Sequence, residues 1–214
     1  MTITLYDYEL SGNCYKLRLL MSILKLPYDI VPVDYYPGRE NRSDWFLRLN
    51  PFGQLPVLKD DDLVLSDSGA ILAYLARKYD ASGRWHPTDA AATAEVLRWH
   101  GVADSITGSV AAARLALSFG LDYDVPRCQR EAHRIFRLMD EHLWFGERGG
   151  RDWLCAPDHP TTADIACFPY VMLSEEAGVG REDYPALRRW TDRVRRVPGF
   201  IVMSGIFPAG AALG

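Results

Sequence analysis

The chain has 214 residues and a formal net charge of −4 at pH 7, a length that can bury the core of one large domain or two small ones. Its hydrophobic fraction of 48% and charged fraction of 24% are typical of globular proteins. Because the balance is acidic, we expect no nucleic acid and no membrane surface as a partner. The apolar runs are all shorter than the ~18 residues that a membrane span needs.

The cysteines and histidines show no metal-binding spacing. Cys14, Cys128, Cys155 and Cys167 lie far apart and form no CxxC motif, and the five histidines show no HxxxH pattern. We therefore predict that the protein binds no metal. The first residues lack the features of a signal peptide, so we expect a cytoplasmic protein with reduced thiols.

The first eighty residues predict alternating strands and helices. Period-two alternation of apolar residues indicates strands, and spacing at three and four residues indicates helices. In chain order we expect a strand at 2–8, a helix at 14–25, a strand at 26–34, a short helix at 43–49, two strands joined by an acidic turn within 55–66, and a helix capped by Ser66 that ends near residue 79. The element order is therefore β-α-β-α-β-β-α.

The sequence after residue 79 has only helical patterns. A long helix is expected at 88–117, and a second begins near Pro126, since proline suits the first turn of a helix. Thr161 and Asp164 form the S/T-x-x-[DE] pattern of a capping box in front of a third helix. This half of the chain therefore predicts a helical bundle.

We predict two domains. Residues 1–79 form an α/β domain, the turn-rich residues 80–88 form a linker, and residues 89–214 form an all-helical domain. The α/β order resembles the thioredoxin-like fold. Four segments, in this order, resemble the cytosolic glutathione transferases of bacterial, theta/nu-like serine type: "LSGNCYKLRL", "NPFGQLPVL", "SDSGAILAYLARKY" and "PTTADIACFP".

This resemblance implies that glutathione is the co-substrate. The family's cis peptide falls at Leu55–Pro56, where the backbone of Leu55 would pair with the extended tripeptide. The first N–H groups of the helix that follows, together with its dipole, suit a carboxylate. The resemblance assigns the γ-glutamyl carboxylate of glutathione to Ser68 and its ammonium group to Asp67.

The sequence lacks the lysine that many family members use to bind the glycine end of glutathione. Gln54 stands where many family members carry a lysine that meets the glycine carboxylate. Gln54 donates a hydrogen bond but carries no charge. We therefore expect a lower affinity at this end, or a charge supplied by Arg39 or Arg42.

The loop "ELSGNCYK" carries the predicted chemistry. Conjugation needs the glutathione thiolate, and lowering a thiol pKa of roughly 8.5 by two units takes about 2.7 kcal/mol. A hydroxyl donor together with helix-terminal N–H groups can supply this free energy. By resemblance, Ser11 is the catalytic serine and Asn13 a second donor. Tyr6 and Tyr8 come too early in the chain to be the tyrosine of the tyrosine-type classes.

Cys14 leaves the reaction open. It matches the second CxxC position of glutaredoxins and the glutathione-bonding cysteine of beta-class enzymes, although many serine-type members have a cysteine here that only packs. The predicted activity is transfer of glutathione to a small electrophile, as in detoxification, with the electrophile bound near Glu9, Leu10 and residues 105–114. The alternatives are a disulfide reductase or peroxidase that uses Asn13 or Cys14, and a non-catalytic scaffold. The family also implies a homodimer.

Overall fold

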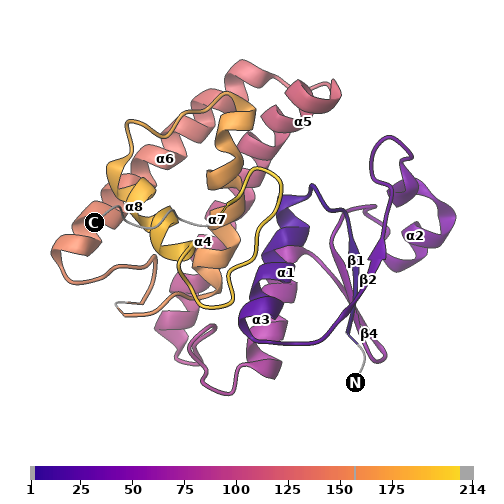
Figure 1. Cartoon of the computed structure of the whole chain (residues 1–214), viewed down its shortest axis with the longest axis horizontal. Helices are drawn as coiled ribbons and strands as arrows, with labels where there is room; N and C mark the ends of the chain where they lie inside the picture. The colour runs from indigo at the N-terminus through magenta and orange to yellow at the C-terminus, as the bar shows by residue number, and fades with distance from the viewer. Residues whose placement is uncertain (1–2, 157, 208–214) are drawn as a thin grey trace.

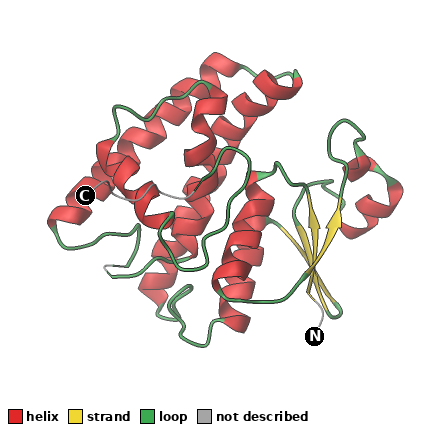
Figure 2. Ribbon diagram, in the orientation of Figure 1, coloured by secondary structure: helices red, strands yellow, loops and turns green. Residues whose placement is uncertain are grey.

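The structure of the protein, a computed structural model, describes residues 3–156 and 158–207. A sheet with one helix on its outer face forms one side of the molecule, and a bundle of helices forms the other (Figures 1 and 2). Helices α1 (Gly12–Ile23) and α3 (Ser68–Tyr79) lie between the sheet and the bundle. The predicted thioredoxin-like domain followed by a helical domain is confirmed.

The sheet has four strands in the order β2-β1-β3-β4. The strands are β1 (Ile3–Asp7), β2 (Asp29–Pro32), β3 (Val57–Asp60) and β4 (Leu63–Ser66). Strand β1 pairs parallel with β2 and antiparallel with β3, and β4 pairs antiparallel with β3. The central strand β1 therefore ends directly before the loop that carries Ser11.

The helices of the α/β domain begin at positions set by their capping residues. Helix α1 begins two residues before the predicted start because Ser11 caps it, its Oγ accepting a hydrogen bond from the N–H of Cys14 at 3.2 Å. The prediction that Ser66 caps the next helix was wrong. The cap of α3 is Asp67, whose carboxylate accepts from the N–H of Ala70 at 2.8 Å, while Ser66 is the last residue of β4.

The remaining elements follow in chain order. They are the 3₁₀ turn η1 (Glu40–Arg42) and α2 (Asp44–Leu49) in the α/β domain, then α4 (Ala90–Ile106), the π-helical turn η2 (Thr107–Ala111), α5 (Ala112–Phe119), α6 (Val125–Arg148), α7 (Thr162–Met172), the 3₁₀ turn η3 (Leu173–Ala177) and α8 (Pro185–Val194). Pro126 lies in the first turn of α6, as expected. None of the helices in the described ranges is both long enough and apolar enough to cross a membrane. The exact domain limits, with a linker at 80–88, stay a prediction.

The predicted long helix is continuous from α4 to α5, but a π turn interrupts its register. The hydroxyls of Thr107 and Ser109 donate to carbonyl oxygens four residues earlier, at 2.9 and 2.8 Å, within and next to this turn. Such a turn adds a residue to the helix and changes the direction in which the next side chains point. It lies beside the pocket described below.

Helix α7 connects the two domains and is held firmly in place. The capping box of Thr161 and Asp164 is present, and Asp164 is fully buried. Its carboxylate also accepts from the N–H of Leu154 at 3.1 Å and from Nε1 of Trp190 at 2.8 Å. Because α7 packs against α1, α3 and α4, these bonds fix the position of its side chains at the domain boundary.

Candidate functional site

A pocket of about 580 Å³ opens between the α/β domain and the helices α4, η2 and α5. Residues that the sequence predicted as site residues and that line it are Ser11, Asn13, Gln54, Leu55, Asp67 and Ser68. Pro56, the remaining predicted site residue, is buried and does not line it. The pocket therefore collects residues from three separate loops of the α/β domain at one place.

The loop between β1 and α1 folds back over the start of the helix. The N–H of Ser11 donates to the carbonyl oxygen of Tyr8 at 2.9 Å, and the N–H of Tyr8 points to Sγ of Cys14 at 3.5 Å. Ser11 is half-buried at the pocket wall. The serine hydroxyl thus stands at the N-terminus of α1, where the helix dipole favours a negative charge.

Cys14 faces the interior and not the pocket. Its side chain is fully buried, and this burial raises the pKa of the thiol to about 12, with the charge of Asp7 adding to the effect. A thiol of this kind stays protonated at neutral pH and is a poor nucleophile. The interpretation of Cys14 as a packing residue is therefore supported, and a redox role that depends on its thiolate is not.

Two buried asparagines hold the loop that contains Gln54. Nδ2 of Asn50 donates to the carbonyl oxygen of Gln54, and Nδ2 of Asn41 donates to that of Gly53, each at 2.8 Å. The predicted cis peptide bond between Leu55 and Pro56 is present. Leu55 and Gln54 are therefore presented to the pocket by a loop that is fixed from behind.

Positive and negative charges occupy different parts of the pocket wall. Arg42 lines it together with Gln54, whereas Arg39 does not. Asp67 and Asp104 also line it, and burial and the charge of Asp67 raise the pKa of Asp104. These carboxylates make this part of the wall negative, and the charge of the buried Lys16 acts on Asp104 in the opposite direction to that of Asp67.

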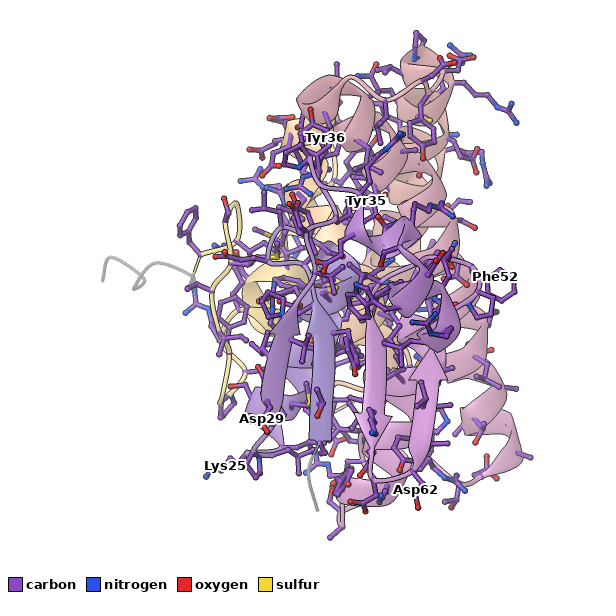
Figure 3. The ribbon with its side chains drawn as sticks, turned by 90° about the vertical axis from the view of Figure 1, so that its right-hand side faces the viewer. Lys25, Asp29, Tyr35, Tyr36, Phe52 and Asp62 are labelled. Carbon is purple, nitrogen blue, oxygen red and sulfur yellow. The ribbon has the colours of Figure 1, made fainter. Side chains whose placement is uncertain are left out.

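The α/β and helical domains share the aromatic rim of the pocket. The rings of Tyr36 and Phe119 stack with centroids 4.5 Å apart, and those of Tyr8 and Tyr35 lie 5.5 Å apart. Tyr35 and Tyr36 lie beyond one end of the sheet, whereas Phe52 projects away from the molecule (Figure 3). The aromatic side chains around the pocket therefore come from both halves of the chain.

The electrophile side differs in one respect from the prediction. Leu10 and several residues of the predicted segment 105–114 line the pocket, but Glu9 does not. The buried Arg114 donates to the carbonyl oxygen of Leu10 at 2.9 Å and pairs with Glu176 at 2.5 Å. Arg114 thereby ties the loop before α1 to the helical domain.

Two sequence models of one family match the chain. The model of the "Glutathione S-transferase, N-terminal domain" matches residues 1–77, and that of the "Glutathione S-transferase, C-terminal domain" matches residues 122–193. The glutathione S-transferase verG of Clonostachys rogersoniana is 31% identical over 199 residues, which cover 87% of this chain and 80% of that protein. The chain belongs to the glutathione S-transferase family.

Other similar proteins place this glutathione S-transferase among members with different named activities. The disulfide-bond oxidoreductase YfcG of Escherichia coli is 29% identical over 194 residues, 87% of each chain. A glutathione transferase homologue from Lodderomyces elongisporus, solved with two GSH per subunit, superposes with a TM-score of 0.83 at 26% identity over 93% of this chain and 95% of that chain. The fold of this transferase is thus shared over nearly its whole described length.

The sequence missed some of the pocket residues that this transferase takes from its helical domain. Tyr170 of α7 and Phe119 of α5 reach the pocket only because the two domains pack together. Asp104 lies one residue before the predicted electrophile segment. No local pattern marks these residues, and the expectation that residues 105–114 form this wall came from the family resemblance. Among residues 3–156 and 158–207, no group of three His, Cys, Asp or Glu side chains is arranged for a metal ion.

Proposed function

We propose that this glutathione S-transferase binds glutathione in the pocket between its domains and activates the thiol through the hydroxyl of Ser11. The observation that carries the proposal is the position of Ser11: it caps α1, and it lines the same pocket as Gln54 and as residues of the electrophile side. A hydroxyl donor at a helix N-terminus stabilises a nearby thiolate more than a thiol. Asn13, two residues later in the same wall, is the second donor.

The charges of the wall support one orientation of glutathione. The γ-glutamyl ammonium would lie against Asp67 and Asp104, and its carboxylate against the side chain of Ser68 and the first N–H groups of α3. The backbone of Leu55 would pair with the cysteinyl residue. The glycine carboxylate would then meet Gln54 and Arg42, so the expected help from an arginine is assigned to Arg42 and not to Arg39.

The reaction follows from this placement. The thiol loses its proton to solvent, and the sulfur attacks an electrophilic carbon of a small molecule held against the aromatic rim. A C–S bond forms, and the leaving group departs with its electron pair or, in an addition, the neighbouring atom takes a proton. The hydroxyl of Ser11 raises the rate at neutral pH because it increases the fraction of bound glutathione that is present as the thiolate.

Glutathione-dependent disulfide reduction is a second candidate. The similarity to YfcG and the presence of Asn13 in the pocket favour it. The buried Cys14 restricts this candidate to a route in which the glutathione sulfur, and not a protein thiol, attacks the disulfide. The predicted polar residues all line the pocket, which disfavours a non-catalytic scaffold.

Family membership also supports a cytoplasmic homodimer that serves detoxification. Phe52 is 73% exposed and Leu97, on α4, is 52% exposed. We expect such side chains to be covered in the dimer. Sedimentation of the wild type and of a Phe52→Ser variant tests this expectation, and equal masses for the two would contradict a role of Phe52.

The function is tested with wild type, Ser11→Ala, Asn13→Ala and Cys14→Ala. Each protein is bound to glutathione-agarose, eluted with glutathione, and assayed for conjugation of an aryl halide and for reduction of a small mixed disulfide. Loss of conjugation in Ser11→Ala, with binding retained, supports the transferase proposal. Disulfide reduction that survives in Ser11→Ala and is lost in Asn13→Ala favours the second candidate. A folded wild type that is not retained contradicts both.

A further inference from the structure

The peptide unit directly before Ser11 is hydrogen-bonded at both of its ends. Its N–H, which belongs to Ser11, donates to the carbonyl oxygen of Tyr8 at 2.9 Å and closes a turn. Its carbonyl oxygen, which belongs to Leu10, accepts from Nη1 of Arg114 at 2.9 Å. Arg114 is 7% exposed, so water does not compete freely for this carbonyl. The plane of the peptide is therefore fixed from two sides.

The neighbouring groups of the turn are also bonded. The carbonyl oxygen of Ser11 accepts from the N–H of Tyr15 at 2.9 Å, and its Oγ accepts from the N–H of Cys14 at 3.2 Å. The carbonyl oxygen of Glu9 accepts from Nη2 of the buried Arg18 at 2.8 Å. These donors all belong to the α/β domain.

Arg114 is the one donor of this set that belongs to the helical domain. It lies in the first turn of α5, which directly follows the π turn η2. A π turn rotates the side chains that follow it, so η2 contributes to the direction of the guanidinium. Nε of Arg114 donates to the carboxylate of Glu176 in η3 at 2.5 Å, while Nη1 donates to Leu10. A planar guanidinium that makes both bonds has one orientation.

The position of the Ser11 hydroxyl depends on the peptide that Arg114 holds. Ser11 is the cap of α1 and has extended backbone angles, so no hydrogen bond of the helix holds its N-terminal side. A hydrogen bond from its hydroxyl to a sulfur weakens steeply when the distance or angle changes. Movement of the peptide between Leu10 and Ser11 would therefore weaken the stabilisation of a thiolate.

We propose that Arg114 is a positioning residue: its bond to the carbonyl oxygen of Leu10 keeps the hydroxyl of Ser11 within reach of the glutathione sulfur, so that the helical domain completes the thiol-activating site of the α/β domain. This inference rests on the proposed role of Ser11. It adds a residue of α5 that acts through the backbone before Ser11. Because an arginine stays protonated in proteins, the bond persists over the whole pH range in which a thiol ionises.

Arg114 also carries a charge that reaches the pocket. It lines the pocket, and its charge opposes the rise that burial causes in the pKa of Tyr8. Such a charge stabilises a thiolate directly, without any effect on Ser11. Arg114→Lys separates the two effects, because lysine keeps the charge but lacks the planar fork that makes two bonds at once.

The matched control is Arg181→Lys. Arg181 is half-buried and makes the same kinds of contact: Nη1 donates to the carbonyl oxygens of Val171 and Met172, each at 3.0 Å, and Nη2 pairs with Glu175 at 2.8 Å. It does not line the pocket. The pKa of bound glutathione is measured from the ultraviolet absorbance of the thiolate and from the pH profile of kcat/KM for an aryl halide. Thermal unfolding reports whether each variant is folded.

We expect Arg114→Lys to raise the pKa of bound glutathione by about 0.5–1 unit and to lower kcat/KM near pH 6.5 about three- to tenfold. Arg181→Lys should leave the pH profile unchanged. In the Ser11→Ala background, Arg114→Lys should have no further effect, because it acts through Ser11. Glu176→Ala removes the other bond of the guanidinium at an exposed residue and should raise the pKa about half as much. It carries the test if Arg114→Lys does not fold.

Two outcomes overturn the inference in distinguishable ways. If Ser11→Ala raises the pKa of bound glutathione but Arg114→Lys and Glu176→Ala both keep the wild-type value, the positioning role fails and the role of Ser11 stands. An additive effect of Arg114→Lys in the Ser11→Ala background has the same meaning. If Ser11→Ala leaves the pH profile unchanged, the proposed function itself fails, and the inference fails with it.

Discussion

The ring of Tyr170 leaves no room for a side chain at Gly12, because a Cβ atom there would approach two ring carbons to 2.8 Å. Gly12 is the first residue of α1 and Tyr170 belongs to α7, so this contact joins the α/β domain to the helical domain. The glycine of the "LSGNCYK" loop is therefore explained by a contact between domains and not by the conformation of the loop itself. Its φ angle is not in the left-handed region.

Gly12→Ala should destabilise the protein by about 1–3 kcal/mol, because the added methyl group forces Tyr170 or α7 to move. Conjugation should fall with it, since the same movement would disturb the start of α1, which Ser11 caps. Urea unfolding and aryl-halide turnover measure the two effects. The matched control is Gly101→Ala in α4, where nothing lies within 4 Å of the new methyl group. There, helix propensity predicts an unchanged or higher stability. Equal behaviour of the two variants would rule out the contact.

Cys14 should be inert in the folded protein. Burial raises the pKa of its thiol to about 12, so almost none of the thiol is ionised at pH 7. A thiol reagent at pH 7 should label the half-buried Cys128 before Cys14. Mass spectrometry of the peptides measures this order. Cys14→Ala should keep at least half of the conjugating activity. A mixed disulfide between glutathione and Cys14 in the folded wild type would reverse this conclusion.

The sequence predicted the part of the site that short segments encode. Ser11 and Ser68 stand at helix starts, and Gln54 stands in a loop marked by Pro51 and Gly53, so motif and local propensity agree there. Tyr170 could not be found in this way. Its place in the pocket depends on how α7 packs on α1. Its neighbours along the chain predict only a buried helix.

Two local features also escaped prediction for physical reasons. Ser66 and Asp67 both suit a helix cap, and strand pairing decided between them: Ser66 pairs with Val57 in the sheet, so the helix begins one residue later. The π turn after Ile106 has no apolar signature, because a run of small residues fits a regular helix equally well. Tertiary contacts overrode equal local preferences in both places.

His100 should make the stability depend on pH. It is 8% exposed, and its Nε2 lies 3.1 Å from Oγ1 of Thr162, which also faces Nδ1 of His86 at 3.2 Å. Burial, then His86 and Lys16, lower the pKa of His100 to about 4. The folded state therefore resists protonation that the unfolded chain accepts near pH 6.5. The stability is fully present above that pH and is lost as the pH falls toward 4.

The ionisation of His100 should lower the free energy of unfolding by roughly 3 kcal/mol between pH 6.5 and pH 4. Urea unfolding of wild type and His100→Gln at half-unit intervals of pH measures it, because the carboxylates that titrate in the same window are common to both proteins. We expect the difference between the two unfolding free energies to shrink as the pH falls. A difference that stays constant from pH 7 to pH 4.5 would mean that His100 ionises normally in the folded protein.

Arg42 and Arg39 offer a direct comparison of two nearby charges. Arg42 lines the pocket near Gln54, and its Nη1 lies 3.4 Å from the carbonyl oxygen of Phe52, whereas Arg39 precedes η1 outside the pocket. If the glycine carboxylate of glutathione binds at this end, Arg42→Gln should raise the KM for glutathione about three- to tenfold. The value is modest because Arg42 is exposed and its charge is screened.

Arg39→Gln removes the same charge three residues earlier and should change the KM for glutathione less than twofold. Both variants should keep the kcat at saturating glutathione, since neither arginine lies beside Ser11. Adding 0.5 M salt should reduce the effect of Arg42→Gln, because screening weakens the interaction that the variant removes. Equal increases in KM for the two variants would instead indicate a long-range attraction for the anionic substrate. In that case Gln54 alone would bind the glycine carboxylate.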